Sequence, residues 1–281
     1  MRNRWRWRSS EHPWKRYVIT EQVGQVNEYI DLNCDIGEHD GLEGAQREAA
    51  ILPHVSSANV ACGLHAGDAR VMRTTMQAAR DLGVAVGAHP SLADRANFGR
   101  REMSVSADEV YELTLYQVGA SAALANAVGV RLNHVKPHGA MYNMAARDRV
   151  LADAVAHAVR DFDAGLVLFG LSGSQLIVAG EEVGLKCASE VFADRRYQPD
   201  GKLTPRSEAD ALIHDVDEAA RQVLGMMEHG IVRARDGSQV SVRAETVCIH
   251  GDTPTAPQFA QHLARMLADA GVTLRAVARI D

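Results

Sequence analysis

Carboxylic acids, histidines and one lysine occur in this sequence directly after runs of apolar, β-prone residues. Carboxylates can act as general bases, imidazoles as proton donors or metal ligands, and an ammonium group as the partner of a phosphate or carboxylate. The members of this set are Asp35, Glu38, His65, Asp68, His89, Lys136, His138, Glu190, Asp194, His250 and Asp252. Their shared position favours one site over scattered surface residues.

Seven β-type runs alternate with longer helix-type segments from Tyr29 onward, which is typical of parallel βα units. The predicted strands are residues 29–35, 57–63, 84–90, 130–138, 166–170, 186–194 and 246–252. In α/β barrels and sheets the carboxyl ends of the strands build the active site. We therefore expect the polar residues that follow these strands to converge.

The side chains of a strand alternate between two faces, which sharpens this expectation. Asp31, Asn33 and Asp35 share one face of the first strand, and His134, Lys136 and His138 share one face of the fourth. A polar interior near the barrel mouth and an apolar exterior against helices explain this alternation. Two cysteines, Cys34 and Cys62, are then small packing residues rather than nucleophiles.

Helix-type periodicity covers most of the segments between the strands. The predicted helices are residues 68–82, 106–128, 147–160, 207–229 and 255–270. Ser106 and Glu109 form a capping-box pattern, and Gly83 and Gly129 stand where a helix would end. Asp236-Gly237 predicts a β-hairpin within residues 231–245, which we interpret as a decoration on the barrel. Residues 30–281 are predicted to be one domain.

Each candidate residue also has a structural interpretation. A single histidine is more often a hydrogen-bonded structural residue than a ligand, Asp31 can brace the barrel floor, and Glu38 and Asp68 can be charges at helix N-termini. Arg100 and Arg101 are either solvated loop charges or contacts for a phosphate or carboxylate. These alternatives stay open at the level of sequence.

Cofactor motifs give weaker signals. The sequence contains neither G-x-x-x-x-G-K-[ST] nor G-x-G-x-x-G. Ser172 and Ser174 flank a glycine after the fifth strand, where backbone amides at the start of a helix could cradle an anion. Asp35, His65 and His89 resemble a metal triad of one carboxylate and two imidazoles, but no H-x-x-x-H spacing supports it. A bound metal is left open.

Composition excludes several classes of protein. A net charge of −6 argues against a nucleic-acid binder, and no apolar run approaches the roughly 20 residues of a membrane span. Four cysteines without a C-x-x-C pair fit a soluble, cytoplasmic protein. Residues 1–29 are basic and contain all three tryptophans, and they lack the apolar core of a secretion signal. We expect them to form a disordered extension, and a membrane-surface or partner-binding arm is the alternative.

Six blocks of this chain, read together, resemble the LamB/YcsF family, whose members are the A subunits of prokaryotic 5-oxoprolinase. The blocks are DLNCDIGE (31–38), SANVACGLHAGD (57–68), GAHPSLADRANFGRRE (87–102), HVKPHGAMYN (134–143), SEVFADRRYQPDGKLTPR (189–206) and CIHGDTP (248–254). They follow the family's order across nearly all of residues 30–281. Leu64 and the loop at 38–46 depart from the family pattern.

The resemblance implies a distorted, seven-stranded parallel βα barrel similar to that of polysaccharide deacetylases. It also implies a protein that acts with the B and C subunits to hydrolyse 5-oxoproline to glutamate, with ATP, accompanied by Mg²⁺, cleaved to ADP and phosphate. Phosphoryl transfer to the lactam oxygen would make the ring carbon electrophilic.

The hypothetical roles follow from that chemistry. Asp35 or His65 is the general base, His89 and His138 are proton donors or oxyanion partners, and Lys136 binds phosphate or carboxylate. We expect His250 and Asp252 to orient water or a nucleotide-bound magnesium ion. The remaining candidates for binding substrate or phosphate are Asn33, Arg100, Arg101, Glu190, Ser172 and Ser174.

Two other functions remain open from the sequence. One is a metal-dependent deacetylase or amidohydrolase that needs neither ATP nor partners. The other is a non-catalytic subunit that presents a ligand to a partner, for which substitutions at Asp35 or His65 would weaken affinity rather than rate.

Overall fold

A computed structural model describes residues 28–39, 41–249 and 255–280 of the chain. Most of the predicted N-terminal extension, residues 1–27, is outside the described residues, so its expected disorder and the domain boundary at residue 30 remain predictions. His250 and Asp252 also lie outside them.

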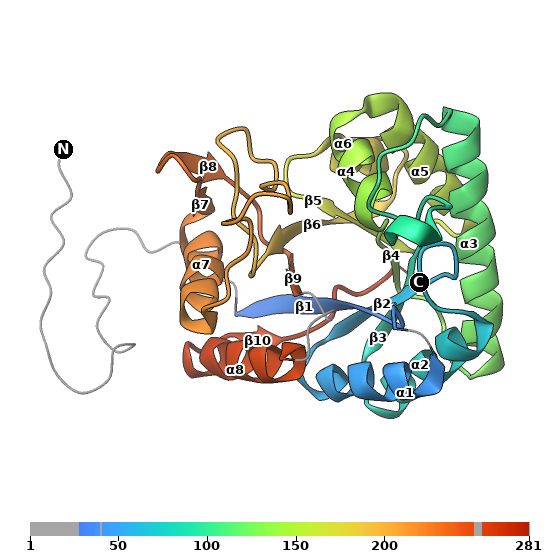
Figure 1. The fold of residues 1–281 in the computed structure, drawn as a ribbon, viewed down its shortest axis with the longest axis horizontal. Coiled ribbons are helices and arrows are strands. Elements are labelled where there is room, and N and C mark those ends of the chain that lie inside the picture. Colours follow the sequence, from blue (N-terminus) through green and yellow to red (C-terminus); the bar gives the residue numbers. More distant parts are fainter. Residues whose placement is uncertain (1–27, 40, 250–254, 281) are drawn as a thin grey trace, which may run out of the picture.

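Seven parallel strands form a closed barrel at the centre of the molecule (Figure 1). They are β1 (Tyr29–Ile36), β2 (Ser57–Ala61), β3 (Ala85–His89), β4 (His134–Val135), β5 (Val167–Leu171), β6 (Lys186–Phe192) and β9 (Thr246–Ile249). Each pairs with the next in this order, and β9 pairs with both β6 and β1. The predicted fold class is confirmed, and each of the seven predicted strands is present.

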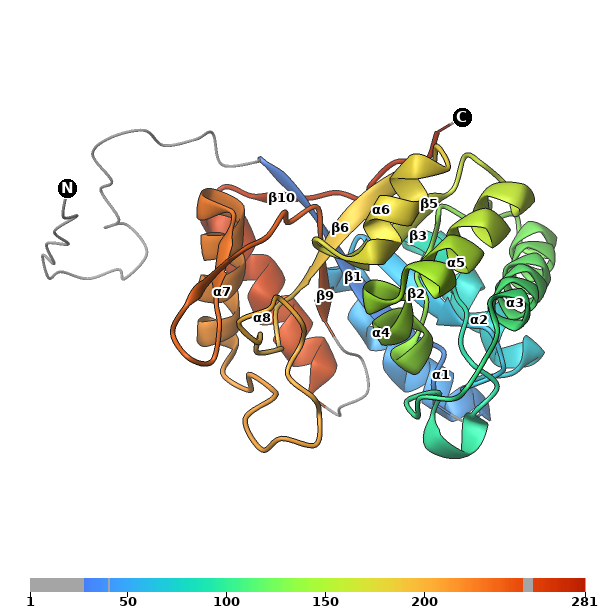
Figure 2. The same cartoon turned by 90° about the horizontal axis from the view of Figure 1, so that it is seen from above.

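Helices surround the barrel, as Figures 1 and 2 show from two directions. They are α1 (Gly41–Glu48), η2 (Ala49–His54), α2 (Ala69–Asp81), η3 (Arg95–Asn97), α3 (Ala107–Ala127), α4 (Gly139–Arg147), α5 (Arg149–Phe162), α6 (Gln175–Glu182), α7 (Val216–His229) and α8 (Ala256–Asp269). Among these described helices, none is long and apolar enough to cross a membrane.

The predicted helix boundaries hold where a local signal marks them. Ser106 and Glu109 form the capping box at the start of α3, and Gly83 and Gly129 follow α2 and α3 with φ of 70° and 75°. The helix predicted at 207–229 is wrong in its first third. That stretch is a loop after Pro205 whose Leu212 bridges to Arg195, and α7 begins at Val216, capped by Asp215.

Two small strand pairs lie outside the barrel closure. β7 (Ile231–Arg233) and β8 (Gln239–Ser241) form the predicted antiparallel hairpin, and Gly237 occupies its turn with φ of 86°. β10 (Thr273–Leu274) extends the start of β1 in parallel and was not predicted. The hairpin is therefore a decoration, as expected, and it leaves the barrel itself unchanged.

The two faces of the strands have opposite character. Outward side chains such as Leu32, Val60 and Leu168 are fully buried in the apolar layer beneath the helices. Inside, Val167, Phe169 and Ala188 form a separate apolar cluster at the amino ends of the strands, against Val277. Most polar side chains of the interior lie above this cluster, so the alternation of the sequence reflects a barrel with a largely polar upper half.

Candidate functional site

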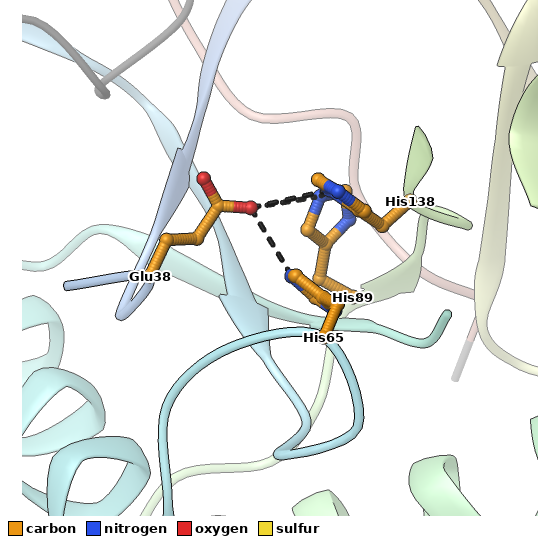
Figure 3. A group of neighbouring side chains, drawn as sticks. All are labelled: Glu38, His65, His89 and His138. Atoms are coloured by element: carbon orange, nitrogen blue, oxygen red, sulfur yellow. Dashed lines mark hydrogen bonds and ion pairs between the residues drawn. The ribbon is translucent and has the colours of Figure 1, made fainter. Parts of the chain in front are cut away.

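Four buried side chains meet at the carboxyl end of the barrel (Figure 3). Glu38 follows β1, His65 follows β2, His89 ends β3 and His138 precedes α4. The Oε1 atom of Glu38 lies 3.2 Å from His65 Nε2, 3.2 Å from His138 Nδ1 and 3.8 Å from His89 Nε2. His138 Nδ1 and His89 Nε2 are 2.9 Å apart. We call these four residues the imidazole cluster.

Backbone carbonyls fix the orientation of two of the rings. His89 Nδ1 donates to the carbonyl of Lys136 at 2.7 Å, and His138 Nε2 donates to the carbonyl of Phe98 at 2.9 Å. A carbonyl oxygen only accepts, so these nitrogens carry the hydrogens. The nitrogens that face the centre of the cluster, His89 Nε2 and His138 Nδ1, are therefore unprotonated in each neutral ring.

The loop of residues 90–101 covers the imidazole cluster. Phe98 has φ of 55°, a conformation that costs a bulky residue about 1–3 kcal/mol, and its ring meets those of His65 and His138 edge-on. A Cβ at Gly99 would lie 2.9 Å from His65 Cβ, so only glycine allows this close packing. The loop is also tied to α4, because Ala140 N donates to Gly99 O at 2.8 Å.

A second group of charges lies beside the first. Lys136 Nζ is 3.0 Å from Asp35 Oδ1 and 2.9 Å from Glu190 Oε1, and all three side chains are buried. We call Asp35, Lys136 and Glu190 the lysine cluster. Its link to the imidazole cluster is the 3.4 Å contact between Asp35 Oδ2 and His89 Nε2.

The ammonium group of Lys136 is fully engaged by the protein. In addition to the two carboxylates, it lies 3.2 Å from Asn33 Oδ1 and 3.0 Å from Cys248 Sγ. Burial lowers the pKa of Lys136, but Asp35, Cys248 and Glu190 outweigh this and raise it well above its usual value. Lys136 is thus a permanent cation that holds two carboxylates in place.

Burial and neighbouring charges shift the pKa values within the imidazole cluster in different directions. Burial is the main reason that the pKa of His65 is lowered to about 4. For His89 burial acts in the same sense, but Asp35 and Glu38 outweigh it and raise the pKa. The pKa of Glu38 is lowered despite burial, because His138 and His65 hydrogen-bond to it. His65 is therefore neutral at pH 7, whereas Asp35 and Glu38 favour the protonated form of His89.

Beneath these clusters is a layer of hydrogen-bonded polar side chains. Asn59 Nδ2 donates to Asn33 Oδ1 at 2.7 Å and to Asp35 Oδ1 at 2.8 Å, and its own Oδ1 lies 2.7 Å from His134 Nε2. We call this layer the polar floor. Its members are Asp31, Asn33, Ser57, Asn59, His134 and Thr246.

Asp31 and Thr246 complete the polar floor. Asp31 accepts hydrogen bonds from the hydroxyls of Ser56, Ser57 and Thr246 at 2.6, 2.7 and 2.5 Å. Thr246 in turn accepts from Asn33 Nδ2 at 2.7 Å. Burial raises the pKa of Asp31 to about 6, although these hydroxyls oppose the shift. Asp31 thus braces the barrel interior, which was the structural alternative for this residue.

Several predicted site residues lie apart from the two clusters. Asp68 caps α2 by accepting from Arg70 N and Val71 N at 2.8 Å, as in its structural interpretation. Ser174 caps α6 by accepting from Ile177 N at 3.4 Å, and Ser172 accepts from Arg243 N at 2.7 Å. The backbone cradle is present at this helix start, but both hydroxyls have structural partners.

The two predicted arginines lie on the outer side of the covering loop. Arg101 has a side chain that is 64% exposed and lies 3.6 Å from Asp94. The guanidinium of Arg100 lies over the ring of Phe98 at 4.7 Å. Neither contact reaches the imidazole cluster directly.

The structure also brings together residues that the sequence did not single out. Asn59 joins the polar floor, Cys248 contacts Lys136, and Tyr142 of α4 is buried near Glu190, whose charge helps burial to raise the tyrosine pKa. The hydroxyl of Tyr142, Glu190 Oε2 and His65 Nδ1 have no well-formed hydrogen bond among the described residues. Strand parity could have revealed Asn59 and Cys248, whereas Tyr142 lies in a helix that was not predicted.

The residues that can hold a metal differ from the predicted triad. The ligand atoms of the imidazole cluster lie within 4.8 Å of one another, and imidazole nitrogens with one carboxylate oxygen suit a transition metal. Glu38 takes the place that we predicted for Asp35, which is held by Lys136 instead. Glu38 was interpreted as a possible helix charge, but it too follows the end of a strand.

Comparison with known proteins gives one consistent family. The model of the LamB/YcsF family matches residues 30–281. A relative from Tolumonas auensis, named as the A subunit of 5-oxoprolinase, is 56% identical over 88% of this chain and 99% of its own length. One from Bacillus subtilis with the same name is 52% identical over 88% of this chain and 96% of its own.

A solved structure agrees with this result. The crystal structure of a lactam utilization protein from Thermus thermophilus superposes with a TM-score of 0.81 at 45% identity. The match covers 89% of this chain and 100% of that protein.

Proposed function

The chain belongs to the LamB/YcsF family, and we propose that it is the A subunit of an ATP-dependent 5-oxoprolinase, which hydrolyses 5-oxo-L-proline to L-glutamate. The observation that carries the proposal is the identity of 52% and 56%, over almost the whole family domain, to relatives that bear the name of this subunit. The proposal includes the B and C subunits as partners, ATP with Mg²⁺ as co-substrate, a cytoplasmic location and one catalytic domain from residue 30 to 281.

The energetics of the reaction define what the site must do. A lactam is a resonance-stabilised amide, and phosphoryl transfer from ATP to its oxygen makes the ring carbon electrophilic. When water adds, loss of phosphate from the adduct would only regenerate the lactam. Productive cleavage therefore requires that the ring nitrogen is protonated and leaves first, which gives an acyl phosphate of glutamate that a second water cleaves to glutamate and phosphate.

We assign the proton transfers to Asp35. It takes a proton from the attacking water as general base, returns it to the ring nitrogen as general acid, and accepts the hydroxyl proton of the adduct as the C–N bond breaks. Its place between the two clusters supports this role, with Oδ1 held by Lys136 and Asn59 and with Oδ2 3.4 Å from His89 Nε2. His65 is the alternative base.

The imidazole cluster supplies positive charge to the anionic phosphoryl group on the lactam oxygen of the adduct that forms when water adds. Fixed charge in a buried site stabilises such an intermediate more strongly than water does. The buried hydroxyl of Tyr142 is a further donor for the substrate. His250 and Asp252, outside the described residues, are proposed to orient the water or the magnesium nucleotide.

Reconstitution of the complex tests the proposal. The full chain is mixed with the B and C subunits, 5-oxoproline and ATP, each component is omitted in turn, and glutamate and ADP are measured. Stoichiometric release that needs all components is expected. Asp35→Asn should lower turnover at least about 100-fold. The matched control is Asp68→Asn, at the same end of the barrel, which should retain turnover because Asp68 only caps α2.

A second function is favoured by the imidazole cluster itself. Three imidazoles and a carboxylate suit a metal-dependent amidohydrolase or deacetylase that acts without ATP. Two outcomes of the reconstitution would replace the first function by this one. The first is no glutamate release with competent partners and ATP, and the second is release by the chain alone in the absence of ATP.

A further inference from the structure

Two ring nitrogens in the imidazole cluster face each other with their lone pairs. His89 Nε2 and His138 Nδ1 are 2.9 Å apart, and the opposite nitrogen of each ring donates its hydrogen to a carbonyl. Two lone pairs at this distance repel. The arrangement therefore requires a positive particle between or beside the two nitrogens, either an additional proton or a metal ion.

The position of Glu38 favours a metal ion over an additional proton. Its Oε1 atom points at the same centre, 3.2 Å from both His138 Nδ1 and His65 Nε2. Among the described residues, the ion-pair contacts of Glu38 within 4 Å are all with histidines, while Lys136 pairs with Asp35 and Glu190. A single proton can bridge one pair of atoms, whereas here four ligand atoms converge.

The distances match those of a tetrahedral metal site. Bonds of about 2.0–2.1 Å to nitrogen or oxygen place neighbouring ligand atoms about 3.3 Å apart in a tetrahedron. Four of the six separations within the cluster are 2.9, 3.2, 3.2 and 3.8 Å, and all six lie within 4.8 Å. An ion at the centre would draw the more distant pairs of ligand atoms together.

The outer contacts are those that metal-binding histidines make. The hydrogen bonds from His89 to the carbonyl of Lys136 and from His138 to the carbonyl of Phe98 orient the free nitrogens towards the centre. Phe98 and Gly99 close the site on the side of solvent. Hydrogen bonds of this kind make the ligands more basic and hold the rings in place.

We propose that Glu38 Oε1, His65 Nε2, His89 Nε2 and His138 Nδ1 bind one divalent transition-metal ion of the Zn²⁺ class. Three nitrogen ligands select such an ion over Mg²⁺, which prefers oxygen ligands and retains its water. The inference goes beyond the proposed function, since metal binding can be measured without turnover. If that function holds, the ion would supply the charge that faces the phosphorylated lactam oxygen.

Metal content of the full chain is the first measurement. The protein is produced without a polyhistidine tag and purified without chelators, and its metals are quantified by mass spectrometry. About one equivalent of a transition metal per chain is expected. After removal of metal by a chelator, Zn²⁺ should restore one equivalent and raise Tm, and Co²⁺ should give the visible absorption of a four-coordinate site.

Variants localise the ion. Loss of a residue that only hydrogen-bonds to a metal ligand weakens metal binding by up to about 100-fold. Loss of a ligand itself should cost more, so His138→Ala and Glu38→Gln should each weaken Zn²⁺ binding at least about 100-fold. The control is His262→Ala, because His262 forms an exposed pair with Asp217 at 3.0 Å and should leave the affinity unchanged. If these variants fail to fold, the stoichiometry and the Co²⁺ spectrum of the wild-type chain decide.

A metal-free chain whose Tm does not respond to Zn²⁺, Co²⁺, Mn²⁺ or Fe²⁺ would overturn the proposal and leave a shared proton between His89 and His138. A bound metal without ATP-coupled turnover would preserve this inference and reject the proposed function. ATP-coupled turnover by a chain that binds no metal would support the proposed function and reject the metal site.

Discussion

The polar floor and the imidazole cluster occupy the same barrel, one above the other, and differ in how completely their polar atoms are satisfied. In the floor, amides and hydroxyls pair with one another, and Thr246 both donates to Asp31 and accepts from Asn33. We call the carboxyl end of the barrel, with the imidazole and lysine clusters, the mouth. There His65 Nδ1, Tyr142 OH and Glu190 Oε2 are buried without a well-formed hydrogen bond among the described residues. The floor is complete, whereas the mouth has binding capacity left for a ligand.

This difference separates structural from functional residues. A complete network of buried hydrogen bonds fixes the strands relative to one another, and an incomplete one leaves binding capacity at a cost in stability. Substitutions in the floor should therefore lower stability more than turnover. Substitutions in the imidazole cluster should do the reverse.

The largest effect on stability is expected where the two layers join. Lys136→Met leaves Asp35 and Glu190 buried without their shared cation, and should lower the free energy of unfolding by about 3–5 kcal/mol in denaturant titrations. Lys186→Met is the control, since Lys186 at the start of β6 donates only to the carbonyl of Ala278. Equal losses for both variants would contradict the central role of Lys136.

The pH dependence of stability should reveal Asp31 in the floor. Its pKa of about 6 in the folded chain exceeds the usual 3.8, so the unfolded chain releases the proton first as pH rises. Stability should therefore be highest below about pH 4 for this group and fall by up to about 3 kcal/mol between about pH 4 and 6.5. Asp31→Asn should lack this component. Parallel curves of wild type and variant would show that Asp31 does not titrate in this range.

His138→Gln tests whether a change in the imidazole cluster lowers turnover more than stability. It removes one of the imidazoles that face the phosphorylated lactam oxygen, so turnover of the reconstituted complex should fall at least about 100-fold. The free energy of unfolding should fall less than for Lys136→Met, because no buried lysine–carboxylate pair is broken. A variant that unfolds more easily than Lys136→Met but retains turnover would reverse the comparison between floor and mouth.

Asn59→Leu makes the corresponding test in the floor. The change leaves His134 Nε2 without its partner, which should cost about 2 kcal/mol of unfolding free energy. It also removes one hydrogen bond to Asp35, but Lys136 still holds that carboxylate, so turnover per folded molecule should stay within about tenfold. Asn126→Leu on the exposed side of α3 should change stability by less than about 0.5 kcal/mol. Intact stability with lost turnover would place Asn59 among the functional residues.

The smallest effect is expected outside both layers. Ser174→Ala removes the cap of α6 and should cost about 0.5–1 kcal/mol, measured by thermal unfolding, with no change in the KM for ATP. A raised KM for ATP would instead support the anion cradle at this helix start. Ser172→Ala, which removes only the acceptor for Arg243 N, is the matched control.

Strand positions could be predicted because the barrel imposes a strict alternation on the sequence. Leu32 and Cys34 lie on the outer face, with Asp31, Asn33 and Asp35 inside. Lengths were less predictable: β4 has two residues and is shorter than expected, since Pro137 has no N–H to donate. Helix α4 was missed because it starts at Gly139, directly after the polar end of that strand.

The candidate site was predictable in its location and less so in its contacts. Strand ends indicated Asp35, His65, His89, Lys136 and His138, which lie together. No spacing in the sequence distinguishes Glu38 from Asp35 as the partner of the imidazoles, because that depends on Gly37, whose φ of 74° redirects the chain after β1. Residues that join through helices, such as Tyr142, have no strand-parity signal at all.

The closure of the barrel between β1 and β9 has a consequence for how the chain folds. Hydrogen bonds from Thr246 to Asp31 and from Asn33 to Thr246 join residues 215 and 213 positions apart. The entropy of closing so long a loop must be overcome before these contacts form, so we expect slow folding. During synthesis one edge of β1 stays unpaired until β9 has left the ribosome. A chain cut before residue 246 should therefore be prone to aggregation.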